Sequence, residues 1–252
     1  MNIDALRDLE RAGVRWELGE TPVGARTSTA TNAPSPAMTT DVPGMRPGPT
    51  VVPACAPITP PDAQMAANAA TDINALAAAI GAFNHPLRTT AGHVVLPHVG
   101  TPGGLMIITD TPGAEDDATG RILSGPAGDM MDKMMAAIGL GRDVVSIVPL
   151  VFWRTPGGRT PTREELDLAH PFVARAIDLI GPRVILTLGT LPASEIAGRS
   201  LPREHGMATQ LPSGALAMPI FHPNYLLLKP DAKRDVWTAL QSVQNMLKDP
   251  EK

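Results

Sequence analysis

Two segments of this chain carry side chains that could do acid–base chemistry together. The stretch TDTPGAEDDATGRILSGPAG contains Asp110, Asp116 and Asp117, and the later segment FHPNYLLLKP contains His222. A carboxylate beside an imidazole suits proton transfer or the activation of water. A histidine can also stabilise negative charge on a departing group. The plain alternative is a solvated acidic loop, together with a loop histidine that bonds to backbone.

A second set of residues suits the binding of phosphate groups. Arg154 and Arg159 lie in the loop FWRTPGGRTPT, Lys229 lies near the end of the histidine segment, and a helix is predicted to begin at Pro126–Gly128. Arginine side chains and the amino ends of helices are common phosphate ligands in proteins. In the alternative interpretation, Arg159 caps a backbone carbonyl and contacts no ligand.

Strands and helices alternate along the part of the chain that carries these residues. Apolar runs predict strands at 105–109, 144–148, 183–188 and 215–221, and apolar periodicity predicts helices at 126–139, after Thr162, at 192–197 and at 231–247. This order predicts a three-layer α/β/α fold with a central four-stranded, mostly parallel sheet. The acidic loop, the arginine loop and the histidine segment then leave the same edge of the sheet, where open α/β sheets place their sites.

The chain divides into three regions by composition. Residues 1–20 read as an amphipathic helix, and residues 21–60 are rich in Pro, Ala and Thr and poor in charge, which predicts a disordered linker. Residues 61–252 form the predicted folded domain, which opens with one helix at 62–80. A helix on a tether suits an interaction with a protein partner.

Charge and cysteine content exclude several classes of function. The net charge of −4 argues against strong, non-specific nucleic-acid binding through bulk charge. The single cysteine, Cys55, excludes an intramolecular disulfide, a four-cysteine zinc site and an all-cysteine iron–sulfur site. His85, His93 and His98 invite a metal hypothesis, but they lack a fourth ligand, so we predict no metal. We see no signal peptide or membrane span, and we expect a cytoplasmic monomer.

Several segments, in order, resemble motifs of the uracil-DNA glycosylase superfamily. The likeness covers about residues 82–247 and is greatest to the iron–sulfur members, called family four. TDTPGAEDDATGRILSGPAG resembles the first motif, WRTPGGRTPTREEL the Arg-Pro-Pro-Gly-Asn-Arg-Thr-Pro-Thr run, PRVILTLG the third strand and FHPNYLLLKP the His-Pro-Ala-Tyr-Leu-Leu motif. The resemblance implies base excision repair, in which a uracil is flipped out of DNA and its N-glycosidic bond is hydrolysed.

The resemblance also implies roles for individual residues. His222 would stabilise the charge that develops on uracil, and Asp110 or Asp116 would position water and oppose the cationic sugar. Positions that would contact the substrate are Thr111, Pro112, Gly113, Leu123, Ser124, Pro149 and Asn224. Positions that would contact the DNA backbone are Gly125, Arg154, Arg159 and Lys229.

The chain departs from the family pattern at several of these positions. Asp110 replaces a glutamate, Thr109 a glycine and Leu123 the phenylalanine that stacks on the base. Pro149 replaces an asparagine and has no amide with which to read a base. His85, Trp153 and Ala169 occupy three of the positions expected for cluster cysteines, so we expect no iron–sulfur cluster and no other cofactor. These departures predict a slow or less selective glycosylase, or an inactive member that binds DNA or a protein.

Overall fold

The computed structural model describes residues 59–248. The predicted N-terminal helix at 1–20 and all but the end of the predicted linker at 21–60 therefore lie outside the described residues. Within the described part, no helix is long and apolar enough to cross a membrane.

The described chain is built on a five-stranded sheet with the strand order β2-β1-β3-β5-β4. Strands β1 (Leu105–Thr109), β2 (Ser146–Pro149), β3 (Val184–Leu188) and β5 (Leu216–Ile220) are parallel to their neighbours. The predicted four-stranded parallel sheet is confirmed. The short β4 (Thr209–Gln210) pairs antiparallel with β5 inside a segment predicted as loop, where two residues give no periodic signal.

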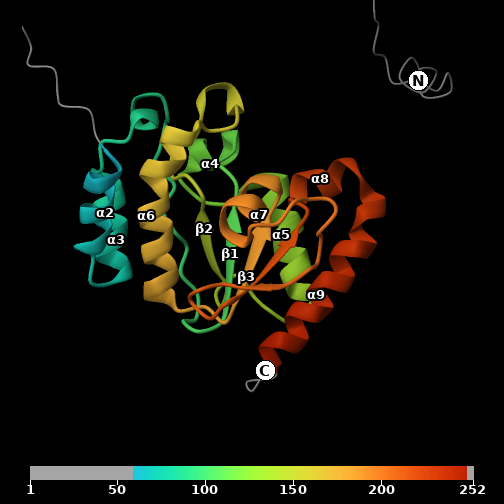
Figure 1. Cartoon of the computed structure of the whole chain (residues 1–252). Helices are drawn as coiled ribbons and strands as arrows, with labels where there is room; N and C mark the ends of the chain where they lie inside the picture. Colours follow the sequence, from blue (N-terminus) through green and yellow to red (C-terminus); the bar gives the residue numbers. More distant parts are fainter. Residues whose placement is uncertain (1–58, 249–252) are drawn as a thin grey trace, which may run out of the picture. The chain divides into compact units, whose positions relative to one another are not determined.

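One face of the sheet is covered by α6 (Arg163–Ile180) and α7 (Thr190–Ala197). Two further helices, α2 (Pro60–Asn68) and α3 (Ile73–Ala82), pack against the outer side of α6 (Figure 1). Because side chains alternate along a strand, Met106 and Ile108 of β1 point into this layer. They meet a core that includes Phe152, Trp153 and Phe172.

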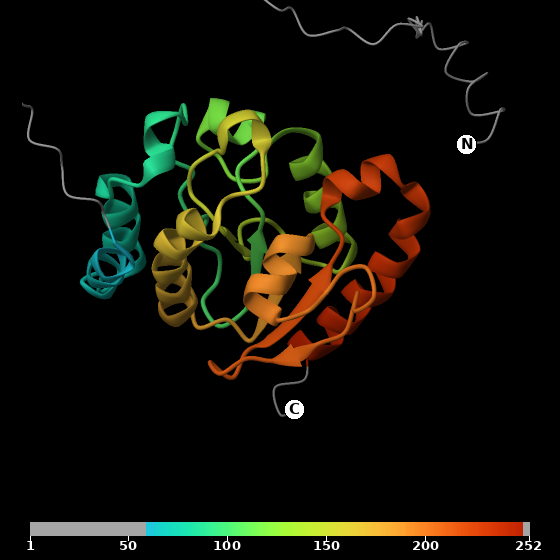
Figure 2. The same cartoon turned by 45° about the horizontal axis from the view of Figure 1, so that its top comes forward.

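The other face is covered by α5 (Gly125–Ala137), α8 (Pro223–Leu228) and α9 (Lys233–Lys248), which the rotated view separates from the α6 layer (Figure 2). Leu105 and Ile107 of β1 point into this second core. Methionines of α5 fill much of the space, as their flexible side chains allow. The three-layer α/β/α fold is thus confirmed.

The remaining elements depart from the predicted pattern or are short. The helix predicted at 62–80 is two helices, because the Asp72 side chain accepts hydrogen bonds from the N–H groups of Asn74 and Ala75 and so starts α3 anew. Helix α4 (Ala114–Thr119) lies inside the acidic stretch. Single 3-10 turns, η1 (Pro86–Thr89), η2 (Pro156–Gly158) and η3 (Pro230–Ala232), each begin at a proline.

Candidate active site

Asp110 and His222 both lie at the carboxyl edge of the sheet. Asp110 follows the last residue of β1, and His222 comes two residues after the end of β5. Both residues line two cavities. The inner cavity, of about 240 Å³, reaches Asp116, Leu123 and Ser124. The outer cavity, of about 550 Å³, reaches Arg159, Leu191 and Tyr225. Predicted residues that line the inner cavity are Asp110, Thr111, Gly113, Asp116, Leu123, Ser124, His222 and Asn224. The two side chains therefore stand where the two cavities meet.

The imidazole of His222 is held in one protonation state by its surroundings. Its Nδ1 accepts a hydrogen bond from the backbone N–H of Asn224 at 3.2 Å, so the proton of the neutral ring belongs on Nε2. Nε2 lies 3.3 Å from the hydroxyl oxygen of Thr109. Burial lowers the pKa of His222 to about 4, although the charge of Asp116 acts in the opposite direction. At neutral pH the ring is a neutral hydrogen-bond donor.

The carboxylate of Asp110 faces both cavities. One of its oxygens accepts the N–H of Thr111 at 2.8 Å. Burial raises the pKa of Asp110, and the hydrogen bond from Thr111 lowers it by less. A carboxylate with a raised pKa is a better base than an ordinary aspartate, which suits the activation of water.

The carboxylate of Asp116 holds the acidic stretch together. It is buried, and one oxygen accepts both the backbone N–H of Ser124 at 2.7 Å and the Ser124 hydroxyl at 2.6 Å. The other oxygen accepts the N–H of Gly113 at 3.0 Å. Asp116 thus joins the start of α4 to the residue before α5. The suggestion that Asp116 acts on water stays a prediction, since these contacts occupy both oxygens.

Leu123 adopts a backbone conformation that is costly for a residue with a side chain. Its φ is +48°, in the left-handed region, and its side chain is buried against the inner cavity. Arg142 donates hydrogen bonds to the carbonyl oxygens of Ile122 and Leu123. A Cβ on Gly128 would lie 1.9 Å from the Leu123 carbonyl oxygen, so glycine is required there. Contacts with Arg142 and Gly128, which lie outside the turn, therefore fix its backbone.

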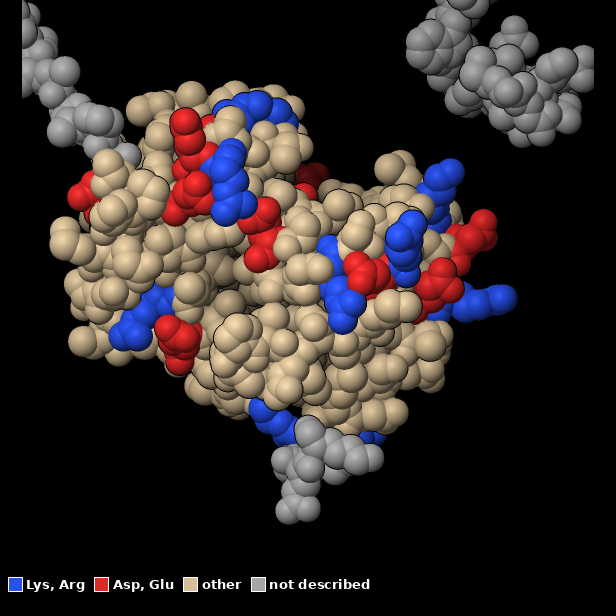
Figure 3. All heavy atoms as spheres, in the orientation of Figure 1, with Lys and Arg blue, Asp and Glu red and all other residues tan. Residues whose placement is uncertain are grey.

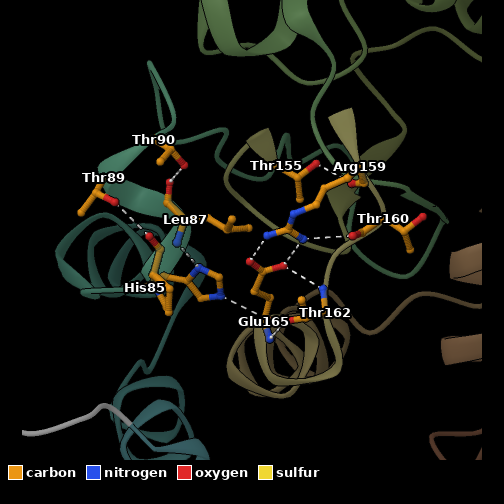
Figure 4. Close-up of polar contacts among 10 residues, drawn as sticks. His85, Leu87, Thr89, Thr90, Thr155, Arg159, Thr160, Thr162 and Glu165 are labelled. Carbon is orange, nitrogen blue, oxygen red and sulfur yellow. Dashed lines mark hydrogen bonds and ion pairs between the residues drawn. The ribbon is translucent and has the colours of Figure 1, made fainter. Parts of the chain in front are cut away.

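Arg159 binds a protein carboxylate, and its expected contact with the DNA backbone stays a prediction. Its guanidinium makes two hydrogen bonds to Glu165, at 2.8 and 2.6 Å, and a third to the carbonyl oxygen of Thr160 (Figure 4). Glu165 also accepts the N–H of Thr162 at the start of α6. The hydrogen bonds from Arg159 lower the pKa of Glu165. The guanidinium therefore shapes this loop through Glu165, and Arg159 also lines the outer cavity.

Other predicted contact residues do not line the inner cavity. Pro149 pairs in register with Thr109 at the end of β2 and is buried, as is Pro112. Gly125 is the first residue of α5, and Lys229 is exposed after α8. Arg154 is half-buried. On the face shown in Figure 3, basic and acidic side chains are interspersed and form no single basic patch.

Some residues of the site were not predicted from the sequence. Thr109 and Ala127 line the inner cavity, and Phe221 and Tyr225 line the outer one. The rings of Phe221 and Tyr225 lie 4.8 Å apart, because α8 brings Tyr225 back over the end of β5. Thr109 could have been found, since it is a polar residue that ends a buried strand directly before Asp110.

Comparison with known proteins identifies the family. A family model described as the uracil DNA glycosylase superfamily matches residues 98–242, which is more than half of the chain. The chain belongs to this superfamily. The resemblance seen in the sequence motifs is thereby confirmed.

Individual members of the superfamily are similar over most of their own length. The type-4 uracil-DNA glycosylase of Thermotoga maritima is 32% identical over 145 residues, covering 56% of this chain and 76% of the relative. That of Pyrobaculum aerophilum is 32% identical over 136 residues, covering 50% and 69%. That of Sulfurisphaera tokodaii is 27% identical over 158 residues, covering 59% and 72%.

The residues at the expected cluster positions do not fit an iron–sulfur cluster. His85 and Trp153 are buried and stacked, with ring centroids 4.5 Å apart and planes inclined by 6°. Both ring nitrogens of His85 are engaged, Nδ1 with the N–H of Leu87 and Nε2 with the carbonyl oxygen of Glu165 (Figure 4). Ala169, one turn after Glu165 on α6, offers no ligand atom. No thiolate is available at these three positions, so no step of the chemistry is assigned to a cluster.

The rings of the three histidines that raised the metal hypothesis each bond to a different backbone carbonyl. His85 bonds to the carbonyl oxygen of Glu165, the Nδ1 of His93 to that of Asp117, and the Nε2 of His98 to that of Arg142. Among residues 59–248, no group of three potential ligands comes together.

Proposed function

We propose that this protein hydrolyses the N-glycosidic bond of uracil in DNA. The observation that carries the proposal is the position of Asp110 and His222, which face both the inner and the outer cavity. A flipped nucleotide has two parts with different needs: the base requires an enclosed pocket, and the sugar requires an open groove. A bond between them would lie between the carboxylate and the imidazole.

The chemistry follows from the protonation states of the two side chains. When the glycosidic bond breaks, its electron pair stays on the base, which leaves as an anion, and the Nε2–H of the neutral His222 donates a hydrogen bond to the oxygen that becomes negative. The sugar is left with positive charge, which the Asp110 carboxylate opposes. A water molecule then adds to the anomeric carbon and gives its proton to Asp110. The products are free uracil and an abasic sugar.

Two residues that depart from the family pattern, Leu123 and Pro149, lead us to expect lower selectivity among bases. Leu123 is aliphatic and buried beside the inner cavity, so it packs against a base without aromatic stacking. Pro149 lines neither of the two cavities, and its side chain has no amide group. Sites that read a substrate by hydrogen bonds reject analogues by about 10⁴–10⁵, and this chain lacks one of those contacts. We expect slow release of uracil and weak discrimination against related bases.

A single-turnover assay tests the proposal. Single- and double-stranded oligonucleotides that contain one uracil are incubated with excess protein, and abasic-site formation is followed over time. We expect base release by the parent protein and a loss of about 10²–10³-fold in rate for His222→Gln. Asp110→Asn should lower the rate as well.

Matched control variants separate loss of chemistry from loss of structure. His170→Gln changes a histidine on α6, and Asp178→Asn changes an exposed aspartate near the end of α6, at the opposite edge of the sheet. Both controls should keep the parent rate. If the parent protein releases no base at high excess over hours, yet binds uracil-containing DNA, it is a binding module and the proposed hydrolysis is wrong.

A further inference from the structure

The hydroxyl group of Thr109 contacts the ring that the proposed reaction depends on. Thr109 is the last residue of β1, its side chain is 4% exposed, and its hydroxyl oxygen lies 3.3 Å from Nε2 of His222. Thr109 also lines the inner cavity. A polar side chain at this depth is expected to have a hydrogen-bond partner, and His222 provides it.

The direction of this hydrogen bond is set on the opposite side of the ring. The backbone N–H of Asn224 can only donate, so Nδ1 of His222 must carry a lone pair. The neutral ring then has its proton on Nε2, which makes Nε2 the donor and the Thr109 hydroxyl the acceptor. A ring turned by half a rotation would place carbon atoms at both contacts and leave the N–H of Asn224 without this partner.

We infer that Thr109 is a positioning residue that holds His222 in a single orientation, with its Nε2–H directed at the Thr109 hydroxyl beside the inner cavity. Backbone fixes one nitrogen and the Thr109 hydroxyl fixes the other. A hydroxyl can rotate and has two lone pairs, so Nε2–H can be shared with an incoming oxygen without a movement of the backbone. The inference deepens the proposed function and rests on it for its catalytic meaning.

The tautomer of His222 can be measured without any reaction. In the full-length protein, ¹⁵N chemical shifts of the histidine rings distinguish a protonated nitrogen from a bare one, and His222→Gln assigns the signals. We expect one species with the proton on Nε2 in the parent protein and in Thr109→Ser. Thr109→Val keeps the shape of the side chain but removes the hydroxyl, so it should show a second species or exchange broadening.

The same variants test the effect on rate. A hydrogen bond of this kind changes an equilibrium by about three- to tenfold, so Thr109→Val should lower the single-turnover rate on uracil-containing oligonucleotide by that factor. The affinity for the same oligonucleotide should stay unchanged, and Thr109→Ser should restore the rate.

The outcomes separate this inference from the proposed function. A parent protein with the proton on Nδ1 overturns the inference without any variant, and so does a Thr109→Val ring identical to the parent ring. A parent protein that shows the expected tautomer and the expected change in Thr109→Val, but releases no uracil, supports the positioning role and contradicts the proposed hydrolysis.

Discussion

The rings of His85 and His222 are held by the same local geometry at two distant places in the chain. Each histidine precedes a proline, each has φ −63° and ψ 143°, and in each the ring Nδ1 accepts the N–H of the residue two positions later at 3.2 Å. The proline that follows favours this extended backbone and removes one donor, so the next N–H is free to bond to the ring.

The two histidines differ at the other nitrogen. Nε2 of His85 bonds to the carbonyl oxygen of Glu165 inside the core, whereas Nε2 of His222 reaches the Thr109 hydroxyl beside a cavity. A backbone carbonyl is a fixed partner, and a hydroxyl can give way to a substrate. The same turn therefore holds a buried structural histidine in one place and, in the proposed function, the histidine that contacts the base in the other.

The rate of base release should fall in acid. His222 must be neutral and its pKa is about 4, while Asp110 must be ionised and its pKa is raised by burial. Both groups take up a proton as pH falls, so both lose their active form on the acid side. We expect a level rate at neutral pH and a decline that begins above pH 4, measured by single-turnover assays across pH.

Asp110→Asn should remove the contribution of Asp110 to this acid decline along with most of the rate. Asp178→Asn should leave the decline as it is. A rate that rises as pH falls toward 4 would show that one of the two groups works in its protonated form.

The carboxylate of Asp116 should contribute mainly to stability. Asp116→Asn removes the charge from three hydrogen bonds that join Gly113 and Ser124, and hydrogen bonds to charged groups are worth about 1.5–3 kcal/mol. Urea unfolding should show a loss of this size. Asp129→Asn, at an exposed position of α5, should change the unfolding free energy by less than about 0.5 kcal/mol. An equal effect of both changes would contradict the loop-closing role.

The salt dependence of DNA binding should separate Arg159 from Lys229. Arg159 is engaged with Glu165, so Arg159→Gln should lower the melting temperature but leave the slope of log affinity against log salt unchanged. If exposed Lys229 contacts a phosphate as predicted, Lys229→Gln should reduce that slope by about 0.9. A reduced slope for Arg159→Gln would mean that the guanidinium leaves Glu165 when DNA binds.

The stacked pair of His85 and Trp153 should stabilise the protein without metal. His85→Ala leaves a cavity against the Trp153 ring and an unpaired N–H at Leu87, which together should cost about 3 kcal/mol. Protein purified from iron-rich medium should show no absorbance at about 400 nm, and chelators should leave its melting temperature unchanged.

His93→Ala is the control for this pair, because His93 is exposed and its ring bonds only at the surface of α4. It should lower the stability much less than His85→Ala. An iron-dependent absorbance band, or a melting temperature that falls with chelator, would overturn the metal-free assignment.

The sequence was sufficient to predict the sheet and the edge that carries the site. Strands such as Leu105–Thr109 are continuous apolar runs that are buried on both faces, and their order along the chain dictates parallel pairing. Asp110 directly follows such a strand and His222 comes two residues after another, so both could be placed at this edge from the sequence. The two-residue β4 and the six-residue helices α4 and α8 were missed, since elements of that length contain no full period.

Partners of individual side chains could not be predicted in the same way. Arg159 looked available for phosphate because the carboxylate that it binds, Glu165, looked like an ordinary residue of the first turn of a helix. Whether a guanidinium faces solvent or a neighbouring carboxylate depends on the path of the loop between them. A sequence motif shows which side chains are present, but their hydrogen-bond partners depend on the conformation of the loop.

The left-handed turn at Leu123 separates two properties that could change independently over evolutionary time. Arg142 and Gly128 hold the backbone of this turn, and neither depends on the side chain at position 123. The side chain at position 123 could therefore be exchanged while the backbone of the loop kept its course. If the proposed function holds, the range of bases accepted can change at this one position while the backbone around it stays intact.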